Sequence, residues 1–433
     1  MMPKNGFSHD VLVIGGGPAG SCAAARLRQH GLRVLVAEKY AFPRFRIGES
    51  LLPAGNHVLA EIGALPKVAA GGFIPKFGAE FHRADGSETK KVVFREGLIP
   101  GLNSAFQVER ARFDALLLDH ARSLGAEVRM ETTVRRVERE GDGHRVVLDG
   151  TAGEQTLTVP WVIDATGRDP GLMSEQKHAL EPSPFPKRLA VYSHFRGVGR
   201  APGPEGGNVL TVRLDGGWFW IIPIDAERTS VGIVTTVEGF RAAGLAPEVF
   251  FQRAVAGSVK LRELLGGAAP TMGFHVTSDY SYFRRELAQE RLVLAGDAAG
   301  FFDPIFSSGV YMATWSGKTA ADLVARAAGE NRGLTPRERR GYTRTVKGRA
   351  GVFQKLIAAF YDEDAFDVFM CQQVPWDLMR GINSIVGGHA RLTWPLRWRF
   401  TLFLLICRLQ RYLRIVRRPA GPATAAVGQP IAS

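Results

Sequence analysis

The stretch "DVLVIGGGPAGSCAAARLRQHGLRVLVAEK", Asp10 to Lys39, decides the fold. Its first part, Val11 to Ile14, is a continuous apolar run, as expected for a parallel strand buried on both faces. Gly15, Gly17 and Gly20 follow with the spacing G-x-G-x-x-G. Gly15 permits the tight turn, Gly17 lets the backbone approach a pyrophosphate, and Gly20 lets the next helix pack close to the strand.

The segment after the glycines predicts the rest of a nucleotide-binding unit. A helix expected over 19–30 offers its N-terminal amides, near Pro18 and Ala19, to phosphate charge. A second strand over 33–37 ends at Glu38, whose carboxylate can bind ribose hydroxyls, and Lys39 follows it. A glycine triplet alone would also suit an ordinary loop. Strand, helix, strand and acid in this order predict a dinucleotide site.

The composition is that of a large protein of the α/β class. The chain has 433 residues, of which 45% are hydrophobic and 22% charged, and its 50 glycines suit many tight loops. This length predicts two or three structural units. Cys22, Cys371 and Cys407 are too widely spaced for a disulfide framework or a metal cluster, so we expect a cytoplasmic location and no metal.

The net charge of +13 would suit an anionic membrane surface or an acidic protein partner. No nucleic-acid motif accompanies it, so binding of nucleic acid is not expected. The N-terminus lacks the apolar core of a signal peptide. No segment approaches the ~18 to 20 uninterrupted apolar residues that span a bilayer, which leaves peripheral contact at the inner membrane as the remaining membrane option.

Three further motifs resemble the hydroxylase-type FAD fold. They are "QVERARFDALLLDHA" (Gln107–Ala121), "VIDATGRDP" (Val162–Pro170) and "RLVLAGDAAGFFDPIFSSGV" (Arg291–Val310). The resemblance implies FAD rather than NAD, with Asp297 on the ribityl chain; by physics alone Asp297 could be a helix N-cap. It implies further cofactor contacts at Arg46, Ile47, Arg110, Pro304, Gly309 and Val310.

Five more stretches resemble the flavin-dependent halogenases, from about residue 8 to about residue 365. Trp218, Trp220, Ile222 and Pro223 spell W-x-W-x-I-P within "DGGWFWIIPID". The others are "FPRFRIGESLLP" (42–53), "GGFIPKFGAEF" (71–81), "FFDPIFSSGVYMATWSG" (301–317) and "FQKLIAAFYD" (353–362). The chain looks similar to the halogenases of phenols and pyrroles, including carrier-protein-dependent and chondramide-type members.

That resemblance implies a reaction in secondary metabolism. Reduced FAD reacts with O2 and chloride or bromide to give hypohalous acid, which halogenates an electron-rich aromatic. The chain has no second nucleotide-binding fingerprint, so we expect a separate NAD(P)H-dependent flavin reductase to supply FADH2. The small aromatic substrate, a phenol or pyrrole, could be tethered to an acidic acyl carrier protein.

The resemblance also assigns catalytic and halide-binding residues. Lys76 stands in the local pattern of the family's catalytic lysine, which holds hypohalous acid or forms a haloamine when burial lowers its pKa. A lone lysine in a loop would otherwise be a solvated charge. Ser308 and Gly309 match the amide pair that holds halide, in a turn that could form an anion-binding nest. A plain helix N-cap is the alternative.

The wall between flavin and substrate is expected from Trp218, Phe219 and Trp220, with Pro223 and Phe306 beside them. Ordinary aromatic packing is the alternative. Phe306 stands where tryptophan halogenases carry a glutamate. A free indole needs such a carboxylate to stabilise its cationic intermediate, so free tryptophan is an unfavourable substrate. A phenol or pyrrole stabilises this cation through its own heteroatom. Glu49 in "RIGES" could be the general base for a phenol, or it could order the flavin loop.

We therefore expect an FAD-binding Rossmann-like part over 8–181, an antiparallel-sheet cover over 182–288, and a second FAD part with the halide turn over 289–330. A helical region over 331–418 and a disordered tail over 419–433 complete the chain. Its segment 394–418 has arginines and aromatics typical of an interfacial helix, although it could simply pack on the core.

Two other functions remain open at this level. An FAD-dependent monooxygenase or a geranylgeranyl-reductase-type oxidoreductase would share the glycine motif and an aromatic strand. A membrane-docked flavoprotein with an idle site is the non-enzymatic option.

Overall fold

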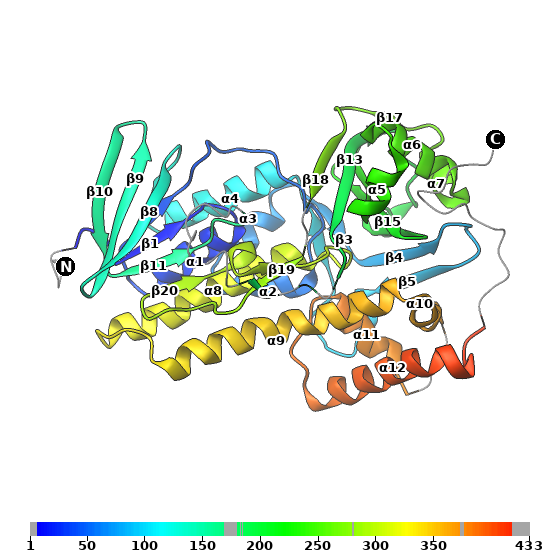
Figure 1. The fold of residues 1–433 in the computed structure, drawn as a ribbon. Coiled ribbons are helices and arrows are strands. Elements are labelled where there is room, and N and C mark those ends of the chain that lie inside the picture. The colour runs from blue at the N-terminus through cyan, green and yellow to red at the C-terminus, as the bar shows by residue number, and fades with distance from the viewer. Residues whose placement is uncertain are drawn as a thin grey trace.

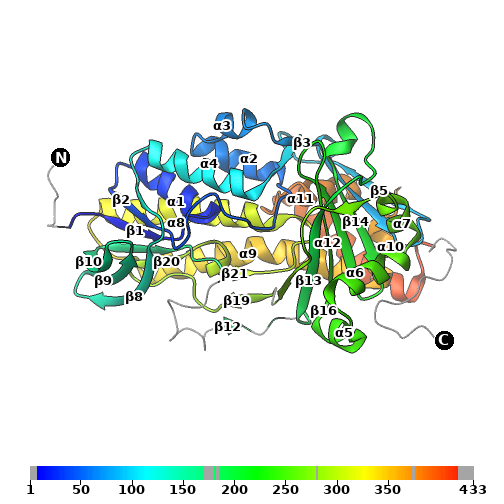
Figure 2. The same cartoon turned by 90° about the horizontal axis from the view of Figure 1, so that it is seen from above.

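The computed structural model describes residues 7–168, 180–181, 183, 185–278, 281–372 and 376–417. A nucleotide-binding sheet and a larger cover sheet lie at opposite ends, and α8 (Ser308–Gly329) and α9 (Pro336–Tyr361) run lengthwise beside them (Figures 1 and 2). Asp169 and Pro170 of the motif "VIDATGRDP" lie outside the described residues, and so does the tail 419–433.

The nucleotide-binding sheet has the order β20-β11-β1-β2-β7, and all its pairs are parallel. Its strands are β1 (Val11–Ile14), β2 (Val34–Ala37), β7 (Glu127–Arg129), β11 (Trp161–Asp164) and β20 (Leu292–Leu294). Every residue of β1, β2, β11 and β20 is buried, as expected for the strands of a parallel sheet that is covered on both faces. The strand predicted over 11–14 is confirmed, and the second strand begins one residue later than expected.

The turn after β1 depends on its glycines. α1 (Pro18–Gln29) begins one residue before its expected start, with proline in its first turn. A Cβ on Gly20 would lie 1.8 Å from the carbonyl oxygen of Gly15. Gly15 has a φ of +97°, which other residues rarely adopt. The strand, tight turn and helix of the predicted nucleotide unit are therefore present.

The motif Gln107–Ala121 combines the end of a strand with most of a helix. α4 spans Arg110–Ser123, because Ala105–Gln107 forms β6 and pairs with β3 (Ile74–Lys76). Lys76 lies opposite Ala105 in this antiparallel pair. An isolated bridge between Ser50 and Gln107 adds the loop before α2 (Pro53–Glu61) to this small sheet.

The cover sheet has the order β17-β13-β16-β15-β14-β4-β5, with β18 also on β13. Its strands are β4 (Gly78–Arg83), β5 (Thr89–Val93), β13 (Arg188–Arg196), β14 (Val209–Leu214), β15 (Gly217–Pro223), β16 (Thr229–Thr236), β17 (Ala269–Pro270) and β18 (His275–Ser278). The predicted boundaries are wrong at one place, because β4 and β5 come from within 8–181. The sheet is also not wholly antiparallel, since β4 and β14 run parallel.

The aromatic strand β15 lies between β14 and β16, and its side chains alternate between two cores. Trp218, Trp220 and Ile222 face the cofactor half. Phe219 and Ile221 face the opposite core, where Phe219 packs edge-on against Phe251 with ring centres 5.1 Å apart. The prediction that Phe219 belongs to the flavin wall is wrong, because neighbouring residues of a strand point to opposite faces.

The C-terminal region is helical, as predicted. α9 begins with a capping box between Thr335 and Glu338, and α10 (Glu363–Met370), α11 (Leu378–Val386) and α12 (Trp394–Leu413) follow. α12 buries Leu396, Phe400 and Phe403. One face of this helix therefore packs on the core, which was the alternative to an interfacial helix. No helix in the described parts of the chain is both long enough and apolar enough to cross a membrane.

Smaller elements complete the fold. They are the hairpins β8 (Thr133–Glu140), β9 (Gly143–Gly150) and β10 (Gly153–Val159), the strands β12 (Leu180–Glu181), β19 (Tyr282–Arg284) and β21 (Gly300–Phe301), the helices α2 (Pro53–Glu61), α3 (Leu65–Ala69), α5 (Val237–Ala243), α6 (Pro247–Ala256) and α7 (Val259–Leu265), and the 3-10 turns η1 (Phe94–Glu96), η3 (Gly203–Gly207) and η4 (Gly296–Ala298).

Candidate functional site

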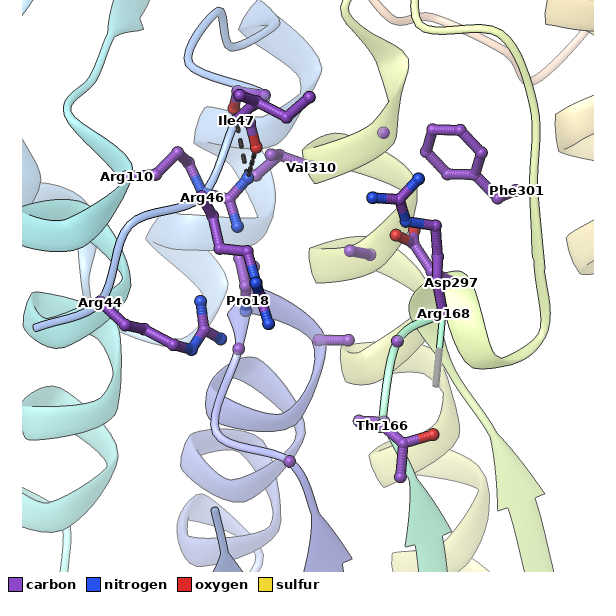
Figure 3. A pocket seen from close by; sticks show the side chains of 18 of the residues that line it. Pro18, Arg44, Arg46, Ile47, Arg110, Thr166, Arg168, Asp297, Phe301 and Val310 are labelled. Carbon is purple, nitrogen blue, oxygen red and sulfur yellow. Dashed lines mark hydrogen bonds between the residues drawn. The ribbon is translucent and has the colours of Figure 1, made fainter. Parts of the chain in front are cut away.

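One cavity of about 770 Å³ lies between the carboxyl ends of the nucleotide-binding strands, the first turns of α1 and α8, and the cover sheet (Figure 3). Most of the predicted site residues line it. They are Gly15, Gly17, Pro18, Ala19, Glu38, Lys39, Arg46, Ile47, Glu49, Arg110, Trp218, Trp220, Asp297, Pro304, Gly309 and Val310. The predicted residues that do not line it are Gly20, Lys76, Phe219, Pro223, Phe306 and Ser308.

The ribose end of the cavity is formed by Glu38, at the end of β2. Its carboxylate oxygens accept hydrogen bonds from the backbone N–H of Gly16 at 2.7 Å and of Tyr40 at 2.9 Å. The side chain is buried, and each oxygen keeps a further lone pair. A carboxylate fixed in this way at the end of the second strand fits the ribose hydroxyls of a dinucleotide.

Positive charge surrounds the first turn of α1, which presents Gly17 and Pro18 to the cavity. The side chains of Arg44 and Arg46 extend towards this turn (Figure 3). Backbone amides at a helix N-terminus attract anions. Arginines beside such a terminus fit a pyrophosphate.

Arg110 orders a loop. Its guanidinium donates to both oxygens of Asp114, at 2.8 and 2.9 Å, and to the carbonyl oxygen of Ile47 at 2.6 Å. It therefore fixes the loop that carries Arg46 and Ile47 to α4, while still lining the cavity (Figure 3).

Asp297 lies in η4, across the cavity from Arg46 (Figure 3). The N-cap of this turn is Ala295, so the helix-cap alternative for Asp297 does not apply. Burial raises the pKa of Asp297 to about 6, although Arg168 and Arg110 act in the opposite direction. A desolvated carboxylate gains from hydroxyl donors, which the ribityl chain of FAD would supply.

The indoles of Trp218 and Trp220 form the cover-sheet wall, with ring centres 6.0 Å apart. Trp220 donates to Ser230 Oγ at 3.1 Å, and Trp218 donates to Tyr361 Oη at 2.8 Å. Each indole N–H thus has a partner that fixes its orientation. A Cβ on Gly232 would come within 2.3 Å of the Trp220 ring.

Two expected wall residues lie elsewhere. Pro223 ends β15 and is buried outside the cavity. Phe306 is 2% exposed and packs against Phe81 and Phe369 at ring-centre distances of 5.8 and 6.1 Å. Neither residue lines this cavity, and Phe306 turns into an aromatic core between the cover sheet and the C-terminal helices.

Lys76 is fully buried and lies one hydrogen bond beyond the cavity. Its ammonium nitrogen donates to Ser50 Oγ at 2.8 Å and to the carbonyl oxygen of Leu51 at 3.0 Å, and it lies 5.4 Å from the centre of the Phe94 ring. Burial lowers the pKa of Lys76 to about 7. The solvated-charge alternative is therefore wrong. Ser50, which lines the cavity, separates Lys76 from it.

The turn before α8 has features of an anion-binding site. Ser307 has a left-handed φ of 56° and caps no backbone amide with its side chain. Ser308 is buried, and its hydroxyl has no hydrogen-bond partner among the described residues. Gly309 lines the cavity at the N-terminus of a 22-residue helix. Helix amides at the cavity, with no side-chain cap on them, can attract an anion, so the halide site at Ser308 and Gly309 stays a prediction.

Glu49 lines the cavity and is paired with a residue that the sequence did not indicate. Its Oε1 lies 2.9 Å from His194 Nε2 of β13, and both side chains are buried. The pair joins the flavin loop to the cover sheet. This geometry favours the loop-ordering role of Glu49, and its role as a base stays a prediction.

Sequence reasoning missed other lining residues, among them Arg44, Ser50, the segment 132–135, Val209 and Thr211. Thr211 lies directly opposite Trp220 in the β14–β15 pair. The alternation of "NVLTVRL" could have identified it once β14 was paired with β15.

The comparisons with known proteins agree with this geometry. The family model described as tryptophan halogenase matches residues 10–94 and 87–367. A 1H-pyrrole-2-carbonyl-[peptidyl-carrier protein] chlorinase of Pseudomonas fluorescens is 34% identical over 75% of this chain and 77% of its own length.

Two solved structures are similar throughout. A flavoprotein/dehydrogenase of Cytophaga hutchinsonii has a TM-score of 0.85 at 29% identity, covering 93% of this chain and 99% of its own. The myxobacterial chondrochloren halogenase has a TM-score of 0.76 at 30% identity, covering 92% and 97%.

The fold and cavity define an FAD-binding enzyme of the hydroxylase type. Within that class, the chain belongs to the flavin-dependent halogenase family. It uses FADH2, O2 and halide to add halogen to an aromatic substrate. The monooxygenase and reductase alternatives are not favoured.

Proposed function

We propose that the chain halogenates a phenol or pyrrole held on a carrier protein, and that Lys76 delivers the halogen. The observation that carries this proposal is the environment of Lys76, which is fully buried, has a pKa lowered to about 7, and is hydrogen-bonded to the cavity residue Ser50. At neutral pH a substantial fraction of this amine is uncharged. It can therefore either donate a hydrogen bond to hypohalous acid or accept halogen on nitrogen.

When bound, reduced FAD supplies the electrons that turn O2 and halide into hypohalous acid. Glu38, Asp297 and the first turn of α1 would hold the cofactor. Trp218 and Trp220 would exclude water from the cavity, since hypohalous acid reacts with exposed nucleophiles. The turn at Ser308 and Gly309 would hold halide at its amides.

The substrate class follows from the surroundings of the wall. Phe306 lies in an aromatic core, so the residue at this position supplies no carboxylate to stabilise a cationic indole. A phenol or pyrrole stabilises the cation through its own oxygen or nitrogen. The similar chlorinase of Pseudomonas fluorescens is named for a pyrrole on a carrier protein, which supports tethering here.

A carrier protein would meet a basic enzyme, because the chain has a net charge of +13, and acidic partners are attracted at a distance by such a charge. A separate flavin reductase, working in the cytoplasm, would supply FADH2. We do not extend the proposal to a membrane surface, because α12 packs one face on the fold.

The proposal is tested with pyrrole-2-carboxylate and 4-hydroxybenzoate, each offered free and as a carrier-protein thioester, with a flavin reductase and bromide. Mass spectrometry of the released acids should show a bromine isotope doublet from the thioesters at a rate at least roughly tenfold above that from the free acids. Equal rates would refute tethering. Bromination of added tryptophan alone would refute the substrate class.

A further inference from the structure

A buried chain of hydrogen bonds links the cavity wall to the turn before α8 through the last residue of α9. Trp218 Nε1 donates to Tyr361 Oη at 2.8 Å, and Tyr361 Oη donates to Asp303 Oδ2 at 2.6 Å. Asp303 Oδ1 accepts from the backbone N–H of Ile305 at 3.2 Å. The linked residues lie 58 and 143 positions apart in the sequence. The chain therefore joins three separate segments, at the end of α9 that lies below the cover sheet (Figure 1).

Arg188 of β13 supports this chain from the other side. Its guanidinium carbon lies 3.6 Å from the centre of the Tyr361 ring, and its Nε lies 3.8 Å from Asp303 Oδ2. Asp303 is 1% exposed, and a buried carboxylate is costly without partners. Burial raises the pKa of Asp303, while the Tyr361 hydroxyl and Arg188 favour its charged form. Tyr361 is thus held by its ring and its hydroxyl at once.

Both ends of this series of hydrogen bonds reach the cavity, but the residue at its centre does not. Trp218 lines the cavity at one end, and Pro304 and Ile305 line it at the other. Tyr361 is not among the lining residues. Removal of its hydroxyl would therefore alter the wall and the turn without changing any atom that faces the cavity.

We propose that Tyr361 is a positioning residue for halogenation, which holds Trp218 and the turn at residues 303–307 in a single arrangement. This inference rests on the proposed function for the roles of the wall and the turn. Without the hydroxyl, Trp218 and Asp303 lose their shared partner. The turn then opens more often, halide is held less tightly, and oxidant escapes to water before it reaches the substrate.

The matched test compares Tyr361→Phe with Tyr342→Phe. Tyr342 lies on the same helix, is buried, and donates its hydroxyl to the carbonyl oxygen of Leu294 at 2.8 Å. Hydrogen exchange of the peptide 301–310 is measured in the FAD-loaded protein without substrate. We expect the Ile305 amide to exchange roughly 5- to 10-fold faster in Tyr361→Phe, as expected for the loss of one hydrogen bond to a charged group. Equal exchange in the two variants would overturn the inference.

Two further readouts separate positioning from simple destabilisation. The bromide dissociation constant, read from flavin fluorescence, should rise roughly 5-fold or more in Tyr361→Phe and stay within 2-fold of wild type in Tyr342→Phe. The ratio of brominated product to FADH2 oxidised should fall by a similar factor, with the excess oxidant trapped by added methionine. Parallel losses in both variants would indicate a structural role only and would overturn the proposal.

If Tyr361→Phe does not fold, Arg188→Lys carries the same test, because it keeps the positive charge and loses the stacking on Tyr361. Faster exchange at Ile305 and weaker bromide binding in Arg188→Lys support the inference, and wild-type values contradict it. The exchange and halide measurements need no product. These measurements therefore still test the role of Tyr361 if the proposed substrate class is wrong.

Discussion

Replacement of Lys76 by methionine should stabilise the protein at low pH while it removes halogenation. Methionine fills nearly the same volume and carries no charge, so it removes the penalty of a buried ammonium. Burial lowers the pKa of Lys76 from the ordinary value of 10.5 to about 7. One pKa unit corresponds to about 1.4 kcal/mol, so a charged Lys76 costs the folded state about 5 kcal/mol relative to the unfolded chain.

The sign of the pH dependence follows from proton binding. Between pH 7 and 10.5 the unfolded chain holds a proton on Lys76 that the folded chain has released, so stability rises with pH in this interval. The cost is complete below pH 7 and falls to about 2 kcal/mol at pH 9. Methionine also leaves the acceptors Ser50 Oγ and Leu51 O without their donor, which costs about 1–3 kcal/mol at every pH. The net gain should be about 3 kcal/mol at pH 6 and close to zero at pH 9.

The assay is urea unfolding of the apoprotein at pH 6, 7, 8 and 9, with the midpoint and slope compared between wild type and Lys76→Met. Lys91→Met is the control, because Lys91 is an exposed lysine paired with Glu205 at 2.7 Å, which raises its pKa. Its effect should not vary between pH 6 and 9. A gain in unfolding free energy in Lys76→Met that does not vary with pH over this range would refute the lowered pKa of the buried lysine. A loss of unfolding free energy at pH 6 would refute it as well.

Three further predictions concern the cofactor and the wall. Gly20→Ala should abolish FAD retention, because its Cβ would lie 1.8 Å from the Gly15 carbonyl oxygen; flavin absorbance of the purified protein checks this, and normal loading would contradict it. Asp297→Asn should stabilise the apoprotein at pH 7, because burial raises the pKa of Asp297 to about 6 and makes its charged form costly above that pH. It should also weaken FAD binding, because the carboxylate that would accept from the ribityl hydroxyls is lost. Thermal melts with and without FAD measure both effects, and a destabilised apoprotein would count against the prediction. Gly232→Ala should destabilise the fold by about 1–3 kcal/mol through overpacking, because its Cβ would meet the Trp220 ring at 2.3 Å. Gly267→Ala, whose Cβ would meet nothing within 4 Å, serves as the comparison, and an equal loss in the two variants would argue against displacement of Trp220.

The nucleotide half could be predicted from the sequence because its rules are local. The strand at Val11–Ile14 and the tight turn at Gly15 follow from neighbouring residues, and the start of the next helix was predicted to within one residue. Glu38 and Asp297 line the cavity as expected. Glu38 comes directly after β2, and Asp297 lies in the turn η4 that follows β20, each within a recognisable motif.

Side-chain directions on the cover side could not be predicted in this way. Phe219 turns away from Trp218 and Trp220 because a strand alternates, and Phe306 turns into an aromatic core that forms only when the C-terminal helices pack. The sequence indicated the chemistry of Lys76 but not its surroundings, because the β3–β6 pairing places it behind Ser50, whose hydroxyl accepts its hydrogen bond.

Pairings between distant residues were also beyond the sequence. Glu49 meets His194 across 145 positions, and Tyr361 meets Asp303 across 58. No single motif contains both partners of either contact. Such contacts depend on the packing of whole elements, which the order of residues along one strand or helix does not reveal.

The most direct test of the central claim is mass spectrometry of the product formed with a flavin reductase, O2 and bromide, for wild type and Lys76→Ala. The account predicts a brominated aromatic from wild type and none from Lys76→Ala, although the variant still oxidises FADH2. A brominated product that is undiminished in Lys76→Ala would contradict the role of the lysine, and a hydroxylated product from wild type would contradict halogenation itself.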